Sequence, residues 1–273
     1  MTSDTKPNET SRLVALQDRP PGHAVIHALC TQPGSFRSRG RLARLFGVRP
    51  LSNDGNHWYQ GALGEREVGR LLSKLGPGWT VLHAVPIGRR GADIDHVVVG
   101  PAGVFTINTK HHANQKVWVA DRALMISGTR QHHIRNAEFE CRRTANLLTK
   151  ALGRPVPVTP VIAVVNAQKL TIRNPPTTVA VVDARRLVKL LKRQPAVLTP
   201  DDLAHLARLI TDPTTWAHQP NPSADLDRRR EFNTIHTTVR AARRTRIAWA
   251  CIMVAASGMS AVLLVQELLR LSS

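Results

Sequence analysis

The sequence has few cysteines and few aromatic residues. Cys30, Cys141 and Cys251 are far apart and form no CxxC pair, which argues against a disulfide framework or a zinc knuckle and favours a reducing compartment. Aromatic residues make up 4% of the chain, so a platform of rings for stacking bases is not expected. The sequence contains no GxxxxGK[ST] motif, so nothing in it supports a P-loop.

Both terminal regions lack the apolar periodicity of a folded core. The chain opens with the polar stretch MTSDTKPNETSR and shows no secretory signal. Residues 1–55 are interrupted by proline and glycine and are rich in arginine, so they are predicted to be mostly disordered. Residues 213–246 are predicted to be a basic linker.

Acidic residues are scarce relative to basic ones. Lysine and arginine total 38 against 19 acids, which gives a formal net charge of +19. Such a surplus favours an anionic partner: nucleic acid, a phosphorylated ligand or an anionic membrane surface. The charge does not choose among these partners, and a soluble protein with an arginine-rich surface would have it as well.

Residues 56–212 have the periodicity of an α/β domain. Val68, Leu71, Leu72 and Leu75 recur at helical spacing, and Gly76 follows them as a stop signal. A second amphipathic helix is predicted over 134–152. Strand-like runs cover 79–85, 93–100, 103–110, 157–166 and 177–183, and two further short strands, 116–120 and 123–127, flank an Asp-Arg turn. This order predicts a mixed sheet flanked by helices, with two short helices as a C-terminal extension.

Residues 247–265 contain no charged side chain. Nineteen residues at helical rise come close to spanning a hydrocarbon core, so a transmembrane helix is predicted. The alternative is a buried core helix, since Ser257, Gly258 and Ser260 dilute the hydrophobicity. Arg240, Arg243, Arg244 and Arg246 precede the span, and this asymmetry predicts a single-pass protein of the cell membrane whose N-terminal part faces the cytoplasm.

Two neighbouring strands carry polar side chains on one face. Asp93 and Asp95 share a face of the run 93–100, and Asn108 and Lys110 share a face of the run 103–110. The GPAG turn between these runs can bring them side by side. Carboxylate and amide oxygens suit Mg²⁺, which takes one or two carboxylates and substrate phosphate oxygens. A lysine beside such an ion can stabilise charge on a phosphoryl group.

The motifs GALGEREVGRLL and GADIDHVVVGPAGVFTINTK, with the helix that carries Arg135 and Asn136, resemble the nuclease-related domain (NERD) family over about residues 58–166. That family resembles the restriction-endonuclease-like PD-(D/E)xK nucleases. The resemblance implies that fold, Mg²⁺ as cofactor and DNA or another nucleic acid as partner. It implies that Asp95 binds the metal and Lys110 is catalytic, that Glu65 is the acid of the first helix, and that Arg135 and Asn136 contact nucleic acid.

One position departs from the family's pattern. Asn108 stands where the (D/E)xK pair has an acid, which keeps an oxygen for the metal and removes a negative charge. Asp95, Asn108, Lys110 and Glu65 are thus the catalytic candidates, and Asp95, Asn108 and Glu65 are the metal ligands. The sequence predicts a membrane-anchored, Mg²⁺-dependent nuclease acting on DNA. The alternatives are a catalytically weak or inactive nucleic-acid-binding module on the same fold and a membrane-associated interaction protein.

Overall fold

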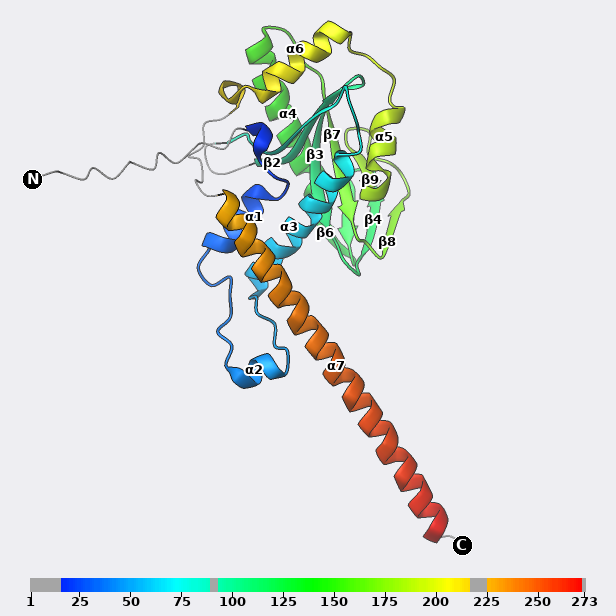
Figure 1. Cartoon of the computed structure of the whole chain (residues 1–273). Helices are drawn as coiled ribbons and strands as arrows, with labels where there is room; N and C mark the ends of the chain where they lie inside the picture. Colours follow the sequence, from blue (N-terminus) through cyan, green and yellow to red (C-terminus); the bar gives the residue numbers. More distant parts are fainter. Residues whose placement is uncertain (1–15, 89–92, 217–224, 272–273) are drawn as a thin grey trace, which may run out of the picture. The chain divides into compact units, whose positions relative to one another are not determined.

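The computed structural model describes residues 16–88, 93–216 and 225–271 (Figure 1). Contacts between residues divide the chain into two units. The first contains Trp58–Asp225 together with the N-terminal segment up to Ala28. The second contains Leu29–His57 and Leu226–Ser273.

A five-stranded mixed sheet forms the centre of the first unit, in the order β1-β2-β3-β7-β9. β1, β2 and β3 pair antiparallel, whereas β7 joins β3, and β9 joins β7, in parallel. The predicted pairing of the two site-bearing strands is confirmed, because Val98 lies opposite Phe105. The strands of this sheet are β1 (Thr80–Pro86), β2 (Asp93–Gly100), β3 (Gly103–His111), β7 (Val158–Val165) and β9 (Ala180–Asp183).

Helices cover both faces of this sheet. Helix α3 (Asn53–Leu72) and α5 (Leu187–Arg193) pack on one face, where Leu72 and Leu187 meet Ile107 in a buried cluster. Helices α4 (His133–Leu152) and α6 (Pro200–Thr211) pack on the other, where Leu148 and Ile210 share a second cluster with Val97 and Val99. The apolar spacings that predicted two amphipathic helices are therefore the spacings of their buried faces.

The first unit also contains a smaller, four-stranded sheet, which was not predicted from the sequence as a separate layer. It has the order β6-β5-β4-β8, and Val117 and Leu124 pack with Ile134 of α4 and Ile162 of β7. Short 3-10 turns lie at η1 (Leu16–Asp18), η2 (Ala184–Arg186) and η3 (Pro213–Thr215). The strands of the smaller sheet are β4 (Lys116–Ala120), β5 (Ala123–Ile126), β6 (Thr129–Gln131) and β8 (Lys169–Ile172).

The N-terminal region is more ordered than predicted. Residues 1–15 lie outside the described residues, but α1 (His23–Thr31) and α2 (Arg41–Leu45) form within the stretch expected to be disordered. An isolated bridge joins Phe36 to Leu51, so residues 36–51 form a closed loop that contains α2. Prolines, glycines and arginines around these short helices obscure this order in the sequence.

The predicted linker is also largely helical. Of residues 213–246, 217–224 lie outside the described residues, and from Asp225 the chain runs as one helix, α7 (Asp225–Leu271). Phe232, Ile235 and Ala242 are buried, a spacing that the surrounding arginines obscure. The helix continues through 247–265, where Met253, Val254 and Leu264 are each more than half exposed. By length and composition, this part of α7 is able to cross a membrane.

Candidate functional site

The site forms where β2 and β3 run side by side. The pairing of His96 with Ile107 brings the chain around Asp95 next to that around Asn108, and the Asn108 side chain contacts Glu140 of α4. The backbone N–H of Thr109 donates a 2.5 Å hydrogen bond to Oδ2 of Asp95. The predicted juxtaposition of these strands' polar residues is therefore present, and Asp95 is held by the backbone of β3.

Glu65 reaches this cluster from α3. Its side chain is buried, 5% exposed, and it interacts electrostatically with Asp95, Lys110 and Asp93. The preceding Gly64 lets α3 come close to β3, since a Cβ at this position would lie 2.9 Å from Cβ of His111. Because Gly64 has no side chain, α3 can bring the Glu65 carboxylate close to the end of β3.

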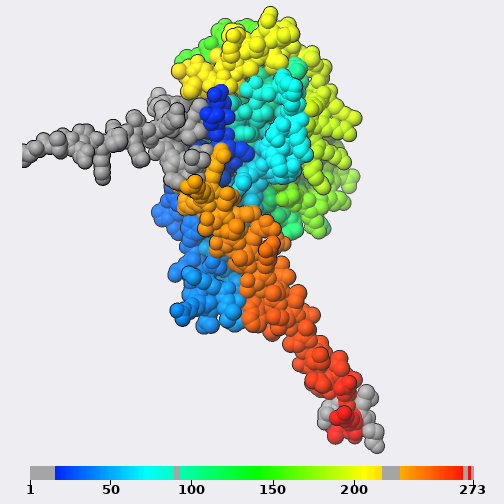
Figure 2. Space-filling view, in the orientation of Figure 1, coloured from blue at the N-terminus to red at the C-terminus, as the bar shows by residue number. Residues whose placement is uncertain are grey.

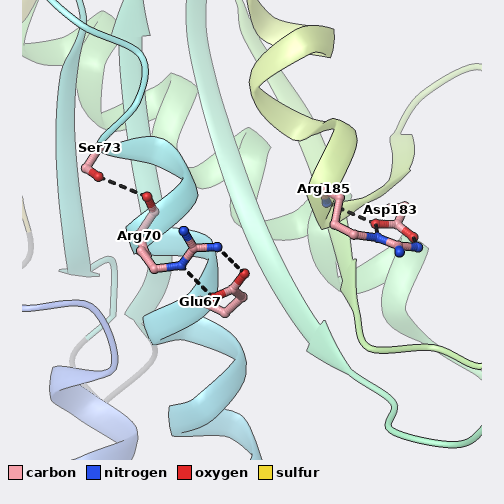
Figure 3. Close-up of polar contacts among 5 residues, drawn as sticks. All are labelled: Glu67, Arg70, Ser73, Asp183 and Arg185. Atoms are coloured by element: carbon pink, nitrogen blue, oxygen red, sulfur yellow. Dashed lines mark hydrogen bonds and ion pairs between the residues drawn. The ribbon is translucent and has the colours of Figure 1, made fainter.

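The second acid of the same motif lies elsewhere. Figure 3 shows the Glu67 carboxylate paired with Arg70, whose Nη2 and Nε donate hydrogen bonds of 2.7 and 2.9 Å to it. Asp183 is held in the same two-point manner by Arg185 (Figure 3). Both pairs are solvent-accessible and contribute little stability. Glu67 and Asp183 are therefore paired with surface arginines and do not belong to the polar cluster.

Glu140 of α4 contacts the polar cluster and was not among the candidates from the sequence. Nδ2 of Asn108 donates a 2.7 Å hydrogen bond to Oε2 of Glu140. Because the Asn108 amide nitrogen faces Glu140, its oxygen points away, and Oδ1 is buried without a hydrogen-bond partner among the described residues. Asn108 therefore presents a free oxygen to the site while a carboxylate from another element lies beside it.

The sequence contains one weak indication that Glu140 is partly buried. The residue lies three positions after Ala137 and four before Thr144, both of which are buried on α4. An acid so close to the buried stripe of an amphipathic helix needs a polar partner inside the fold. Sequence spacing gives no indication that this partner is Asn108, 32 residues earlier.

Burial dominates the protonation of the acids. It raises the pKa of Glu65 well above its ordinary range, with further increases from Asp95 and Asp93, while Lys110 lowers it. Burial also raises the pKa of Asp95, against the lowering effects of Lys110 and the Thr109 hydrogen bonds. Burial, opposed by the hydrogen bond from Asn108, raises the pKa of Glu140 to about 7. The ammonium group of Lys110 thus interacts with all three carboxyl groups.

The backbone opposite Asp95 is unusual. Ala84 of β1 has φ of 49°, a left-handed conformation that is uncommon for a residue with a side chain. The pairs that flank it, His83 with His96 and Val85 with Ile94, place it across from Asp95. Its carbonyl accepts a 2.7 Å hydrogen bond from Nη1 of the buried Arg19. Strained backbone of this kind gathers at functional sites.

The two predicted nucleic-acid contacts lie at the beginning of α4. Arg135 and Asn136 are both exposed, and Asn136 precedes Glu140 by about one helical turn. Within the described part of the chain, no three His, Cys, Asp or Glu side chains form a ready-made metal site. An ion here would also need the amide oxygen of Asn108.

Comparison with known proteins matches the nuclease-related domain to residues 60–165. A 58-residue stretch is 41% identical to an uncharacterized protein of Bacillus anthracis, an alignment that covers 20% of this chain and 27% of that protein. The chain therefore aligns with about a quarter of the relative's length. No solved structure matches the chain.

Proposed function

From the nuclease-related domain at residues 60–165 and the geometry of its polar cluster, we propose that the protein is a membrane-anchored, Mg²⁺-dependent nuclease that hydrolyses DNA phosphodiesters. We propose a restriction-endonuclease-like arrangement for the first unit. The observation that carries the proposal is the contact between Asn108 and Glu140, which leaves the buried Oδ1 of Asn108 without a hydrogen-bond partner in the described part of the chain, one residue before the Thr109 N–H that binds Asp95.

The donor set suits a hard cation. Asp95, Glu65 and Oδ1 of Asn108 would hold Mg²⁺, and Glu140 would supply the carboxylate that Asn108 lacks. Glu65, Asp95 and Glu140, when ionised, carry three negative charges against one positive charge on Lys110, and these groups interact. A divalent cation would compensate that excess. When bound, such an ion polarises a phosphodiester and lowers the pKa of a water molecule.

The chain's own residues supply the remaining chemistry. Lys110, beside the three acids, would stabilise the charge that develops on the phosphoryl oxygens. Thr109 fixes the Asp95 carboxylate through its backbone N–H. Arg135 and Asn136, exposed on α4, would contact the nucleic-acid backbone, and the net charge of +19 would favour its approach.

Residues 247–265 of α7 would cross the cell membrane once. The arginines that precede them support a cytoplasmic nuclease-related domain, because the positive-inside rule favours that orientation. The second candidate function, a catalytically weak nucleic-acid-binding module on the same fold, is favoured by one observation. Asn108 occupies the strand position at which the (D/E)xK pair has an acid. Metal affinity would therefore depend on the carboxylate of Glu140.

A cleavage assay tests the proposal. Supercoiled and linear DNA are incubated with the full chain in Mg²⁺, Mn²⁺ or EDTA, alongside the Asp95→Asn, Lys110→Ala and Glu67→Gln variants. Glu67→Gln is the matched control, because Glu67 is an acid of the same helix that pairs with Arg70 at the surface. We expect metal-dependent cleavage by wild type and Glu67→Gln only. DNA binding without cleavage would support the second candidate, and cleavage that survives both site variants would overturn the site.

A further inference from the structure

We propose that the loop of residues 36–51, the basic loop, is a docking surface for an anionic lipid bilayer. The inference rests on the proposed membrane span of α7 and goes beyond the nuclease proposal. Its occupant is the headgroup layer of the membrane that α7 enters, and its observations all lie in the second unit.

Three contacts fix the tip of the basic loop to α7 where the arginines end and the apolar stretch begins. Nη1 of Arg246 donates a 2.9 Å hydrogen bond to the carbonyl oxygen of Gly47. Nε1 of Trp249 donates another, also 2.9 Å, to the carbonyl oxygen of Leu45. The rings of Phe46 and Trp249 lie 5.1 Å apart between centroids. Figure 2 shows this loop against the upper part of α7.

Gly47 makes the close approach feasible. It has φ of 67°, and a Cβ there would lie 2.5 Å from the carbonyl oxygen of Ala242. The base of the loop is closed by the bridge between Phe36 and Leu51. The loop is therefore built as part of the juxtamembrane region and held at a fixed height along α7.

The tip exposes apolar side chains. Leu42 is 71% exposed, Leu45 55% and Phe46 51%, all within or next to α2. Tryptophan concentrates at the boundary between water and lipid, and Trp249 lies in the first turn of the apolar stretch. A membrane that begins near Trp249 would cover Leu42, Leu45 and Phe46 as well, and this removes apolar surface from water.

The charge around these apolar residues matches an anionic surface. Residues 36–51 contain five arginines and no acid, and residues 240–246 of α7 add four more arginines. Arg37, Arg39 and Arg44 line a cavity of about 220 Å³ together with Thr234 and Thr238 of α7. Guanidinium groups bind phosphate oxygens in two-point geometry, and each basic residue near an anionic leaflet adds to the attraction.

The test places an environment-sensitive fluorophore on the full chain reconstituted in vesicles. Native cysteines are replaced, and single cysteines are introduced by Leu42→Cys, Ala256→Cys or Gln194→Cys. Leu42 reports the basic loop, Ala256 the proposed span and Gln194 an exposed site on the first unit. Vesicles contain phosphatidylcholine alone or with phosphatidylglycerol, and some carry lipids with a spin-labelled quencher near the headgroups.

We expect the probe at position 42 to shift to the blue and to be quenched strongly in vesicles with phosphatidylglycerol, and the response to weaken at high salt. Arg37→Gln, Arg39→Gln and Arg44→Gln together should remove most of this response. The matched charge control is Arg122→Gln, Arg173→Gln and Arg193→Gln, three exposed arginines of the first unit, which should leave it unchanged.

The outcomes separate the two proposals. A probe at 256 within the bilayer with a probe at 42 in water would overturn the basic-loop proposal and keep the span. A probe at 256 in water would overturn the membrane proposal itself. A probe at 42 that responds to duplex DNA and not to lipid would replace the bilayer with nucleic acid as the loop's partner.

Discussion

Asn108 donates a 2.7 Å hydrogen bond from Nδ2 to Oε2 of Glu140, and this contact joins strand β3 to helix α4. If Glu140 supplies the carboxylate that Asn108 lacks, the two residues should be exchangeable as a pair. Glu140→Gln should lower cleavage or Mg²⁺ affinity by at least about 10-fold, because a carboxylate is lost from the ligand set. Adding Asn108→Glu to that variant restores the carboxylate from the strand and should recover most activity.

The single variant Asn108→Glu is the informative control for this exchange. It places two carboxylates at hydrogen-bonding distance, so without metal it should lower thermal stability. Added Mg²⁺ should reduce that loss, measured as the shift in Tm between EDTA and Mg²⁺. A double variant as inactive as Glu140→Gln alone, with unchanged Tm, would show that Glu140 acts in another way.

Gly64 controls how closely α3 approaches β3. Gly64→Ala would place a methyl group 2.9 Å from Cβ of His111 and 3.1 Å from Cγ2 of Thr109, so we expect a loss of about 1–3 kcal/mol in the free energy of unfolding and slower cleavage as Glu65 moves away. Gly61→Ala is the matched control one turn earlier, where the nearest atom is Cγ1 of Val25 at 3.8 Å. It should be neutral or stabilise by up to about 1 kcal/mol. Equal effects of the two substitutions in denaturant unfolding would contradict the close approach.

His83 should make the first unit sensitive to acid. Its Nδ1 lies 2.8 Å from Nδ1 of His96, and burial lowers the pKa of His83 from 6.5 to about 4. Between about pH 6.5 and pH 4, His83 is therefore protonated in the unfolded chain and neutral in the folded chain. Stability is fully present above this window and falls as the pH drops through it, by up to about 3 kcal/mol from His83.

His83→Gln keeps a hydrogen-bonding side chain next to His96 and removes this titration. Plots of unfolding free energy against pH should therefore be flatter for His83→Gln than for wild type between pH 4 and pH 6.5. His205→Gln, at an exposed position of α6, should retain the wild-type slope. An unchanged slope in His83→Gln would show that other groups cause the acid sensitivity.

The sequence predicted most of the first unit because its elements have clear periods. The runs 93–100 and 103–110 predicted both strands. The period of two predicted a shared face for Asp93 and Asp95 and another for Asn108 and Lys110, and the GPAG turn predicted that the two strands are neighbours. The smaller sheet was missed as a layer because β6 and β8 are three- and four-residue strands. Segments this short have no measurable period.

The site was harder to predict than the sheet. Asp95, Asn108, Lys110 and Glu65 were candidates from motif and resemblance. Burial raises the pKa of Glu65 and of Asp95, and the positive charge of Lys110 opposes both increases. Glu140 was missed because a contact between a strand and a helix 32 residues later has no local pattern. The helix within residues 225–246 was missed because arginines surround Phe232, Ile235 and Ala242.

Deletion of residues 247–273 should release the protein from membranes. Those residues include the exposed apolar stretch of α7, whereas Phe232, Ile235 and Ala242 would remain to pack in the second unit. The truncated chain should partition into the soluble fraction after a high-salt wash, because the remaining attraction of the basic loop to anionic lipid is screened by salt. Replacing 247–265 with an unrelated apolar helix of equal length is the matched control. It should keep the protein in the membrane fraction, since insertion depends on length and hydrophobicity. A truncated chain that resists both salt and alkaline washing would show that the attachment lies outside α7, and the single-pass anchor would then be wrong.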